Sequence, residues 1–443
     1  MSTARPGGPQ DAVPAHQPAA DIAASTGGDV SVEEQLATVL AAVRVLPAER
    51  VETGTATGAT LRDPVSAAVP VPVFDNSAMD GFAVRHDDVT HAGPARPVRL
   101  RVVADLPAGT SDDPALGPGE AARIMTGAPV PSDADTVVPF EDTVGGLADS
   151  LATATVVRSP RAAGAHVRRV GEDLRAGDVV LEAGTLLGPF QVAAAAAAGA
   201  GTVLVSRRPR VAVVSTGSEL VAPGTPLRHG QVPESNSVLL AGMVTATGAD
   251  VVARLSVDDE GGALRHALGH LTTGDQPVDV VVFSGGVSAG AFEVVRTELS
   301  ATMTFTTVAM QPGKPQGFGA LPTGTLLFGL PGNPVSAAVS FETFVRPALL
   351  ALQGRSTLHR AVLRLPASVA WRPPQGRRQY LPAVVETTSD GTWGVRPATP
   401  GGSASHRAGG LARARALAVV PAETSTVDVG DLVDVQLLEG WDA

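Results

Sequence analysis

The alternation of apolar and polar positions predicts two kinds of element in the first half of the chain. Apolar residues recur at helical spacing through Ser31–Leu46, and Ser31 with Glu34 forms a capping box, which predicts an amphipathic helix. From about residue 85 to 170, short β-branched runs alternate with Pro, Gly and Asp clusters, as in a β-rich lobe. The Ala-rich run Gln191–Ala200 predicts a packed helix that stops at Gly199.

A more regular pattern follows the polar run RRPR at Arg207–Arg210, which we interpret as a domain boundary. Apolar strand-like runs now alternate with helical segments, an order typical of a parallel α/β sheet. Beyond about Thr357, short strands with Gly and Pro between them predict a separate β domain. In the α/β part, strands are predicted at 211–217, 251–257 and 278–286, and helices at 236–246, 263–271 and 335–352.

Composition narrows the function classes. The 443 residues carry a formal net charge of -11, which disfavours a nucleic-acid partner because such a surface repels phosphate backbones. The chain has no cysteine, so disulfides, thiolate nucleophiles and Cys-ligated zinc are excluded. The first 30 residues lack an apolar core and read as a tail rather than a signal peptide. Gln191–Ala200 is shorter than the roughly 20 residues of a membrane span, so we expect a cytoplasmic protein.

Three glycine-containing loops follow predicted strands: STGSE at Ser215–Glu219, SGGVSAG at Ser284–Gly290 and LPGNPVS at Leu330–Ser336. In parallel α/β sheets, ligands bind at the carboxyl ends of the strands. Glycines let the backbone approach a ligand, and the N–H groups of a following helix favour an anion. A single loop of this kind is a structural turn more often than a site. Three on one sheet predict binding of a phosphate or another oxyanion, with serines as further donors.

Carboxylates follow the same strand ends. Glu219 comes after the first loop, Asp259 closes a strand, and Glu293 comes after the second loop, while Asp75 and Asp173 lie in the N-terminal half. Any one of them fits a helix cap or a solvated face. Beside anion-binding loops, several carboxylates indicate a Mg²⁺ site, because Mg²⁺ takes hard oxygen ligands and bridges phosphates.

Basic residues and absent motifs complete the picture. The loop PGKP carries Lys314, and GRR places Arg377 and Arg378 in the C-terminal domain; in an acidic protein an oxyanion site needs such local cations. The histidines show no HExxH-like spacing, so we expect no zinc site. The sequence also lacks a GxSxG elbow, a Walker A loop and a complete GxGxxG before a helix. It is therefore not expected to be a classical hydrolase, a P-loop protein or a Rossmann dinucleotide-binding protein.

Taken together, these motifs make the chain resemble the molybdopterin molybdenumtransferases, the family of MoeA and the gephyrin E domain, from about Ser31 to the C-terminus. The resemblance is carried by long, ordered motifs spread over the chain. They are FDNSAMDGFAV (Phe74–Val84), GEAARIMTGAPVPSDADTVVPFED (Gly119–Asp142), HVRRVGEDLRAGD (His166–Asp178), RPRVAVVSTGSEL (Arg208–Leu220), SNS (Ser235–Ser237), FSGGVSAG, QPGKPQGFG (Gln311–Gly319) and GLPGNPVSA.

The resemblance implies a multidomain α/β fold whose centre is a three-layer α/β molybdopterin-binding domain. It also implies a homodimer, in which the N-terminal region of one subunit completes the site of the other. The reaction would insert molybdenum from molybdate into adenylylated molybdopterin, with Mg²⁺, and release AMP and molybdenum cofactor. The implied segments are a disordered tail 1–30, an N-terminal mixed domain 31–84 and 171–207, an inserted β-rich lobe 85–170, the α/β domain 208–355 and a C-terminal β-barrel-like domain 356–443.

Family motifs also imply roles for individual residues. Asp75, on the FDNSAMDG turn, would reach across the dimer toward the metal and the pyrophosphate. The implied catalytic residues are Asp75, Asp173, Glu219 and Asp259, and the implied metal ligands are Glu219, Asp259, Glu293 and Asp75. The implied substrate-binding residues are Thr126, Ser215, Gly217, Ser284, Gly285, Gly286, Ser288, Lys314, Pro331, Gly332, Pro334, Ser336, Arg377 and Arg378.

The chain departs from the family pattern at several of these motifs. Gln311 stands where many members carry Lys, Ser218 replaces an Asp, Phe82 replaces a Tyr, and Glu293 replaces an Asp. The segment Gly409–Arg415 lacks the family's serines, so a molybdate contact there would be missing or come from Ser403 or Ser405.

These departures leave open a preference for tungstate over molybdate. Two rival functions also stay open at this stage, the adenylyltransferase that makes the substrate and a non-catalytic scaffold of the same fold. That adenylyltransferase is also a candidate partner protein.

Overall fold

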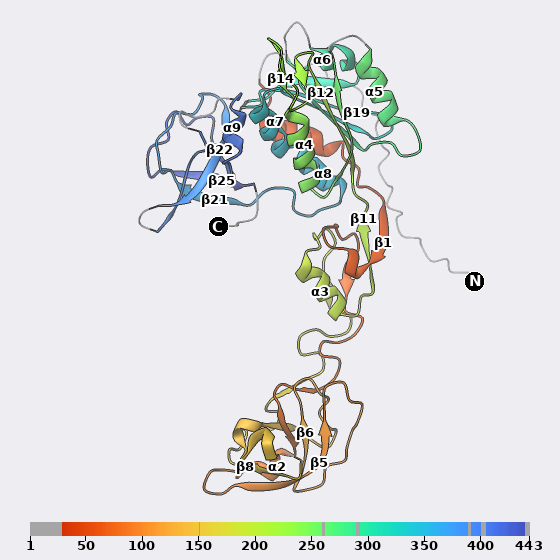
Figure 1. Ribbon diagram of the computed structural model, residues 1–443, viewed down its shortest axis with the longest axis vertical. Helices are drawn as coiled ribbons and strands as arrows, with labels where there is room; N and C mark the ends of the chain where they lie inside the picture. The colour runs from red at the N-terminus through yellow and green to blue at the C-terminus, as the bar shows by residue number, and fades with distance from the viewer. Residues whose placement is uncertain are drawn as a thin grey trace, which may run out of the picture.

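The computed structural model describes residues 29–149, 151–258, 262–288, 293–388, 391–399 and 405–438. The molecule is elongated, with four parts along its length (Figure 1). A β-rich lobe forms one end, a small mixed unit follows, and the α/β domain and the C-terminal β domain lie side by side at the other end. The chain passes from the α/β end to the lobe and back again before it builds the α/β domain.

A six-stranded sheet in the order β15-β12-β16-β20-β19-β17 is the centre of the α/β domain. The first four strands are parallel, whereas β19 and β17 are antiparallel to their neighbours. Every residue of β16 and β20 is buried, as expected for strands that are covered on both faces. The strand bounds are β12 Arg210–Thr216, β15 Asp250–Val257, β16 Val280–Ser284, β17 Met303–Thr307, β19 Pro315–Ala320 and β20 Leu326–Leu330.

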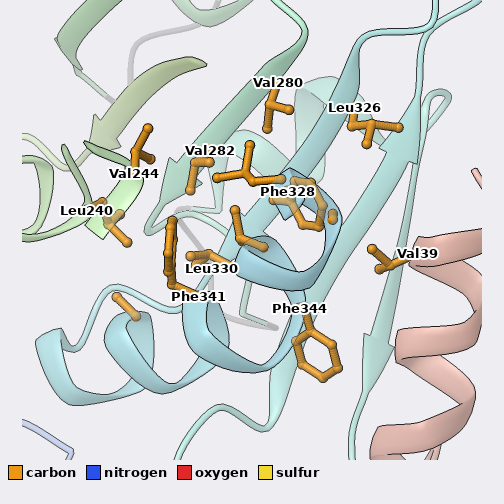
Figure 2. Close-up of a cluster of buried hydrophobic side chains, with 14 of the residues drawn as sticks. Val39, Leu240, Val244, Val280, Val282, Leu326, Phe328, Leu330, Phe341 and Phe344 are labelled. Carbon is orange, nitrogen blue, oxygen red and sulfur yellow. The ribbon is translucent and has the colours of Figure 1, made fainter. Parts of the chain in front are cut away.

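Alternate residues of these strands fill two apolar cores, one on each face of the sheet. Val280 and Val282 point to a core that helices α4 (Asn236–Ala246), α7 (Pro334–Ser340) and α8 (Arg346–Leu352) cover, and Figure 2 shows their side chains beside Phe328 and Phe341. Val281 and Phe283 point to the opposite core, under α5 (Ala263–Thr272) and α6 (Val294–Leu299). The predicted α/β class is therefore correct, with helices on both faces.

The long helix predicted at 335–352 is continuous but contains one wide turn. Residues Phe341–Val345 between α7 and α8 form a π-helical segment. This helix, Pro334–Leu352, is apolar and long enough to cross a membrane, but 78% of its most apolar window is buried inside the molecule. It is therefore a core helix, and Phe341 and Phe344 from its wide turn pack into the core of Figure 2.

Helix α1 (Val32–Ala41) begins at the predicted capping box. The Ser31 hydroxyl accepts from the Glu34 N–H at 3.1 Å, and the Glu34 carboxylate accepts from the Ser31 N–H at 2.9 Å. The helix ends at Ala41, five residues before the predicted Leu46. Its apolar face packs against the α/β core, where Figure 2 shows Val39, so α1 is tied to that domain rather than to the mixed unit.

The mixed unit and the lobe are built from short strands and the Ala-rich helix α3 (Pro189–Ala197). The lobe sheet has the order β7-β4-β6-β5-β8, and β4 lies inside it, so the lobe begins a few residues before the predicted 85. Phe82 on β4 packs edge-on against Phe140 at 5.3 Å between ring centroids. The mixed unit contains β1 Ala48–Glu52 with β11 Thr202–Ser206 and β2 Val65–Ser66 with β10 Val179–Leu181. The lobe contains β4 Gly81–Val84, α2 His86–Val89, β5 Val98–Leu106, β6 Glu120–Ile124, β7 Thr136–Pro139 and β8 Thr153–Val156, with β3 Asn76–Ser77 and β9 Val167–Arg168 paired at its neck.

The C-terminal β domain has the strand order β18-β22-β24-β25-β21, with β23 paired to β22. Strand β18 comes from the α/β segment, and its parallel pairing with β22 joins the two domains. The bounds are β18 Met310–Gln311, β21 Val362–Pro366, β22 Arg378–Thr387, β23 Trp393–Pro397, β24 Ala416–Val420 and β25 Leu432–Leu437, with a short helix α9 at Ala408–Leu411.

Candidate functional site

The three glycine-containing loops lie side by side at the carboxyl edge of the sheet, as predicted. Strands β12, β16 and β20 are neighbours, and Ser215 pairs with Ser284, which pairs with Leu330. The residues that follow these three positions therefore leave the sheet together. This edge carries Ser215, Gly217, Ser284, Gly285, Gly286, Pro331, Gly332 and Pro334.

Two of the loops are in direct contact, and only glycine fits between them. Gly285 has a φ of +95°, and a Cβ built on it would lie 2.7 Å from the Thr216 carbonyl oxygen and 2.9 Å from the Thr216 hydroxyl. Gly332 of the third loop also lies close, since its Cβ would be 3.5 Å from the Gly285 Cα. The three loops thus form one backbone-lined surface, which suits close approach by a ligand.

A buried carboxylate that the sequence analysis missed organises this surface. Glu234 accepts from the Ser215 hydroxyl at 2.8 Å and from the Ser237 N–H at 2.7 Å, which connects the end of β12 to the first turn of α4. Asn236, in the same turn, donates to the Ser284 hydroxyl at 2.8 Å and to the Gly332 carbonyl at 2.6 Å. The run ESNS before a helix was the available signal, but Glu234 there reads as an ordinary helix-start residue.

Two buried polar atoms at this edge have no hydrogen-bond partner among the described residues. They are the Thr216 hydroxyl and the Asn236 Oδ1. Buried polar atoms are nearly always paired, so unpaired ones at a loop cluster point to a missing ligand or solvent group. An amide Oδ1 accepts only, so the group that binds there must donate through an N–H or O–H.

The carboxylates predicted to hold metal divide into separate places. Glu219 is exposed, and its carboxylate oxygens lie against Gly217, within 2.7 to 2.9 Å of where a Cβ would stand. Glu293 accepts from the Ser288 N–H at 2.8 Å. Asp259 lies outside the described residues. Within the described part of the chain no three His, Cys, Asp or Glu residues gather as a metal site would require.

The basic residues gather at the same edge, beyond β20. Because β19 is antiparallel to β20, Lys314, directly before β19, lies at the edge where β20 ends. Buried Gln316 holds this loop by donating to the Gly313 carbonyl and to the Ser340 hydroxyl, both at 2.6 Å. Ser336 is buried in the first turn of α7. Arg377 and Arg378 approach from the C-terminal domain, where β18 pairs with β22.

A serine from the C-terminal domain also reaches the third loop. The Asn333 side-chain amide donates to the Ser405 hydroxyl at 3.2 Å, and the Val335 N–H donates to the Ser405 carbonyl at 3.2 Å. Of the two serines considered for the missing family contact, Ser405 is therefore beside the site, whereas Ser403 lies outside the described residues.

Asp75, Thr126 and Asp173 do not join this edge within one chain. Asp75 pairs with Arg169 at 2.6 Å and accepts from the Val170 N–H at 2.7 Å, at the neck of the lobe. Thr126 donates its hydroxyl to Asp80 at 2.8 Å. Asp173 is exposed in the turn beyond β9. The strand that follows Glu219 pairs with β14 (Val232–Pro233), which Figure 1 shows in the α/β domain. The neck of the lobe lies far from there.

Two aspartates at the neck have lowered pKa values, which gives a pH-dependent prediction. The Val170 N–H, with the Arg169 guanidinium, lowers the pKa of Asp75, and the Thr126 N–H and hydroxyl lower the pKa of Asp80. A lowered folded-state pKa stabilises the fold above the unfolded value, near pH 3.9, and this contribution is lost as the pH falls through the folded pKa. We expect Asp80→Asn to lower lobe stability at pH 7, with a difference from wild type that shrinks below about pH 4.

The measurement is a urea titration at pH 7, 5 and 3, followed by the Thr126 amide resonance. Asp112→Asn, at another exposed lobe position, is the control. A deficit of Asp80→Asn that stays constant down to pH 3 would contradict the assignment.

The prediction that the histidines show no HExxH-like spacing is wrong for one pair. His266 and His270 are four residues apart on α5, the spacing of HExxH without its Glu, and their Nε2 atoms lie 3.0 Å apart. A structural zinc site needs four protein ligands and a catalytic one three. No third ligand of the His, Cys, Asp or Glu type joins them in the described ranges.

The chain matches three family models that together span most of its length. They are the MoeA N-terminal region (domain I and II) over residues 30–199, the probable molybdopterin binding domain over 212–351, and the MoeA C-terminal region (domain IV) over 364–438.

Curated relatives and a solved structure agree with these matches. Molybdopterin molybdenumtransferase 2 of Mycobacterium tuberculosis is 41% identical over 420 residues, which are 93% of this chain and 99% of that protein. Molybdopterin molybdenumtransferase of Nostoc sp. is 36% identical over 405 residues, 88% of each chain. The crystal structure of a molybdopterin biosynthesis MoeA protein from Pyrococcus horikosii superposes with a TM-score of 0.73 at 30% identity, and covers 94% of this chain and 100% of its own.

Proposed function

Because the chain belongs to the MoeA family and is a molybdopterin molybdenumtransferase, we propose that it inserts molybdenum from molybdate into adenylylated molybdopterin and releases AMP. The observation that carries this proposal is the joined surface of three loops with two unpaired buried polar atoms. A phosphate fits backbone N–H groups, and the acceptor Asn236 Oδ1 suits a ring N–H or amino group of the pterin or the adenine.

The molybdate would bind beside the loops, on the cations that line the same edge. Lys314, Arg377 and Arg378 supply positive charge in a protein of net charge -11, and Ser336 and Ser405 lie next to the third loop. Charge-assisted hydrogen bonds to an oxyanion are about twice as strong as neutral ones. In this reaction the molybdenum is a substrate, and its sulfur ligands come from molybdopterin, which agrees with a chain that has no cysteine.

The chemical step breaks the phosphoanhydride bond between the two phosphates of the adenylylated substrate. An oxygen of molybdate or of water attacks the adenylyl phosphorus, the bridging P–O bond breaks, and AMP departs with the new oxygen. The other phosphate stays on molybdopterin. The two dithiolene sulfurs form Mo–S bonds in place of two Mo–O bonds. One of these oxygens departs on AMP when molybdate attacks, or as water when water attacks, and the other departs as water with the two thiol protons. The chain's part is to hold both phosphates and the molybdate in line, because positioning and charge stabilisation account for most of phosphoryl-transfer catalysis.

We further propose that Glu219, exposed at this edge, binds a Mg²⁺ ion, whereas Glu293 accepts from the Ser288 N–H at a separate place and Asp259 lies outside the described residues. The donor set fits, because Mg²⁺ sites commonly use one or two carboxylates together with substrate phosphates and waters. When bound, the ion supplies charge neutralisation on the phosphates.

The positions of Asp75, Thr126 and Asp173 favour a homodimer. Their contacts are with residues of the lobe and of its connection to the mixed unit, and Figure 1 shows the lobe apart from the α/β domain, so a second copy would have to offer its loop surface to them. We propose that these residues complete the partner subunit's site. We also propose a cytoplasmic location, with the adenylyltransferase that makes the substrate as a partner protein.

The test is AMP release from adenylylated molybdopterin, measured with and without molybdate, tungstate and Mg²⁺. We expect AMP only when an oxyanion and Mg²⁺ are both present, with loss of the signal on chelation by EDTA. Adenylylation of molybdopterin from ATP would instead identify the rival adenylyltransferase. Absence of both reactions, in a protein that still binds partner proteins, would favour the scaffold.

A further inference from the structure

The chain just before α1 is fixed to the α/β domain as a short added strand. The Val30 N–H donates to the Thr307 carbonyl at 2.7 Å, and the Ala309 N–H donates to the Val30 carbonyl at 2.8 Å. Val30 thereby pairs in parallel with Val308, two residues before β18. These bonds place Asp29 at the junction of the α/β domain and the C-terminal domain.

The Asp29 carboxylate lies between two of the cations proposed to bind molybdate. One of its oxygens is 3.7 Å from the Lys314 Nζ and 4.0 Å from the Arg377 Nε. Both distances exceed a hydrogen bond, so the pairing is electrostatic and loose. The side chains of all three residues are about one third exposed, which leaves the group open to solvent and to a small anion.

The charged groups around Asp29 nearly cancel one another. Glu33, in the first turn of α1, forms an ion pair with Arg378. Gln311 accepts from the Arg377 guanidinium at 3.5 Å, so a neutral amide stands beside it where many family members carry Lys. Two carboxylates therefore oppose the three cations of the group, and one carboxylate fewer would raise its net charge from +1 to +2.

We propose that Asp29 is a specificity-determining residue that competes with the incoming oxyanion for Lys314 and Arg377. This inference rests on the proposed function, because it takes these two cations as molybdate ligands. A carboxylate and an oxyanion cannot share the same two cations without repulsion, so Asp29 must swing toward solvent when molybdate binds. The loose contacts allow this movement, whereas the tighter Glu33–Arg378 pair stays in place.

The consequence is an oxyanion affinity below what the two cations alone would give. Removing one unit charge at this distance in a partly solvated site changes binding by about three- to tenfold at low salt. The gain should shrink as salt is added, since screening weakens partly exposed charges. A dianion such as molybdate should gain more than a monoanion such as perrhenate, because the repulsion scales with the charge of the ligand.

Calorimetric titration of the full chain with sodium molybdate, sulfate and perrhenate tests this. Four proteins are compared: wild type, Asp29→Asn, Lys314→Gln and Asp250→Asn, the last a matched loss of one carboxylate at the opposite edge of the sheet. We expect about three- to tenfold tighter molybdate binding for Asp29→Asn, weaker binding for Lys314→Gln and no change for Asp250→Asn. Thermal melting of each variant checks the fold.

The outcomes separate this inference from the proposed function. If Lys314→Gln weakens binding but Asp29→Asn leaves it unchanged or weaker, then Asp29 does not compete and the inference is wrong, while the oxyanion site stands. If molybdate binding is the same in wild type and Lys314→Gln, or is absent from all four proteins, the oxyanion site on Lys314 and Arg377 is wrong and this inference with it, whereas the proposed function is decided separately by AMP release.

Discussion

Glu219→Ala should lower AMP release by at least about a hundredfold while the protein stays folded. Glu219 is exposed at the carboxyl edge of the sheet, and its carboxylate lies over Gly217 at the end of the first loop. In the proposed reaction it binds the Mg²⁺ that offsets charge on the phosphates, and groups that stabilise developing charge each contribute about 10²- to 10³-fold. Because no described residue donates to this carboxylate, truncation leaves no buried donor unpaired, and the melting temperature should not fall.

The measurement is single-turnover AMP release at saturating molybdate and Mg²⁺, with Asp250→Ala as the control. Asp250 stands at the start of β15, at the opposite edge of the same sheet, and carries the same charge. It should retain wild-type turnover. Comparable turnover in Glu219→Ala and the control would remove Glu219 from the mechanism. A parallel titration with Mn²⁺ separates weaker metal binding, which more metal overcomes, from a lost chemical role.

Gly285→Ala should destabilise the α/β domain by about 2–5 kcal/mol and abolish binding of the adenylylated substrate. The left-handed backbone at Gly285 costs an L-residue about 1–2 kcal/mol. Its Cβ would in addition lie 2.7 Å from the Thr216 carbonyl oxygen, and overpacking of this kind costs about 1–3 kcal/mol. The atom that would be hit is backbone, so the first two loops must move apart, and the joined surface is lost.

Gly430→Ala is the matched control for this variant. Gly430 has a φ of +93°, close to that of Gly285, but a Cβ there would meet no atom within 4 Å. It should show the backbone cost alone, about 1–2 kcal/mol, and normal substrate binding. Urea unfolding measures both variants, and titration with adenylylated molybdopterin reports the binding. If Gly285→Ala behaves like Gly430→Ala, the contact between the loops does not matter.

Local patterns were sufficient for the α/β part of the fold. The predicted bounds of α4 match the structure, and the capping box at Ser31 is formed by both of its hydrogen bonds. The three glycine loops were predicted to share one edge, because parallel strands end together, and the strand order confirms it. The early end of α1 has no comparable local signal. Its last predicted turn gives way to a connection to β1, where the Leu46 N–H bonds to the Leu352 carbonyl from α8.

Long-range partners account for what the sequence could not predict. Glu234 matters because of Ser215, 19 residues earlier, and Asn236 because of Gly332, 96 residues later. Likewise, nothing in the local sequence distinguishes Asp29 from other acidic residues, because its contact with Lys314 exists only in the folded chain. The position of Asp75 at the neck, away from the loop edge, depends on how the chain leaves the mixed unit, which no local motif encodes.

The lobe enters and leaves the rest of the molecule at a single point, because Asn76 pairs with Arg168 in the β3–β9 ladder. An insertion whose two ends meet adds no loop-closure cost to the domain that carries it. We therefore expect that a tight hairpin turn can join the two ends, so that the lobe can be deleted from the chain. The same junction leaves the short β3–β9 ladder as the connection between the lobe and the rest of the molecule.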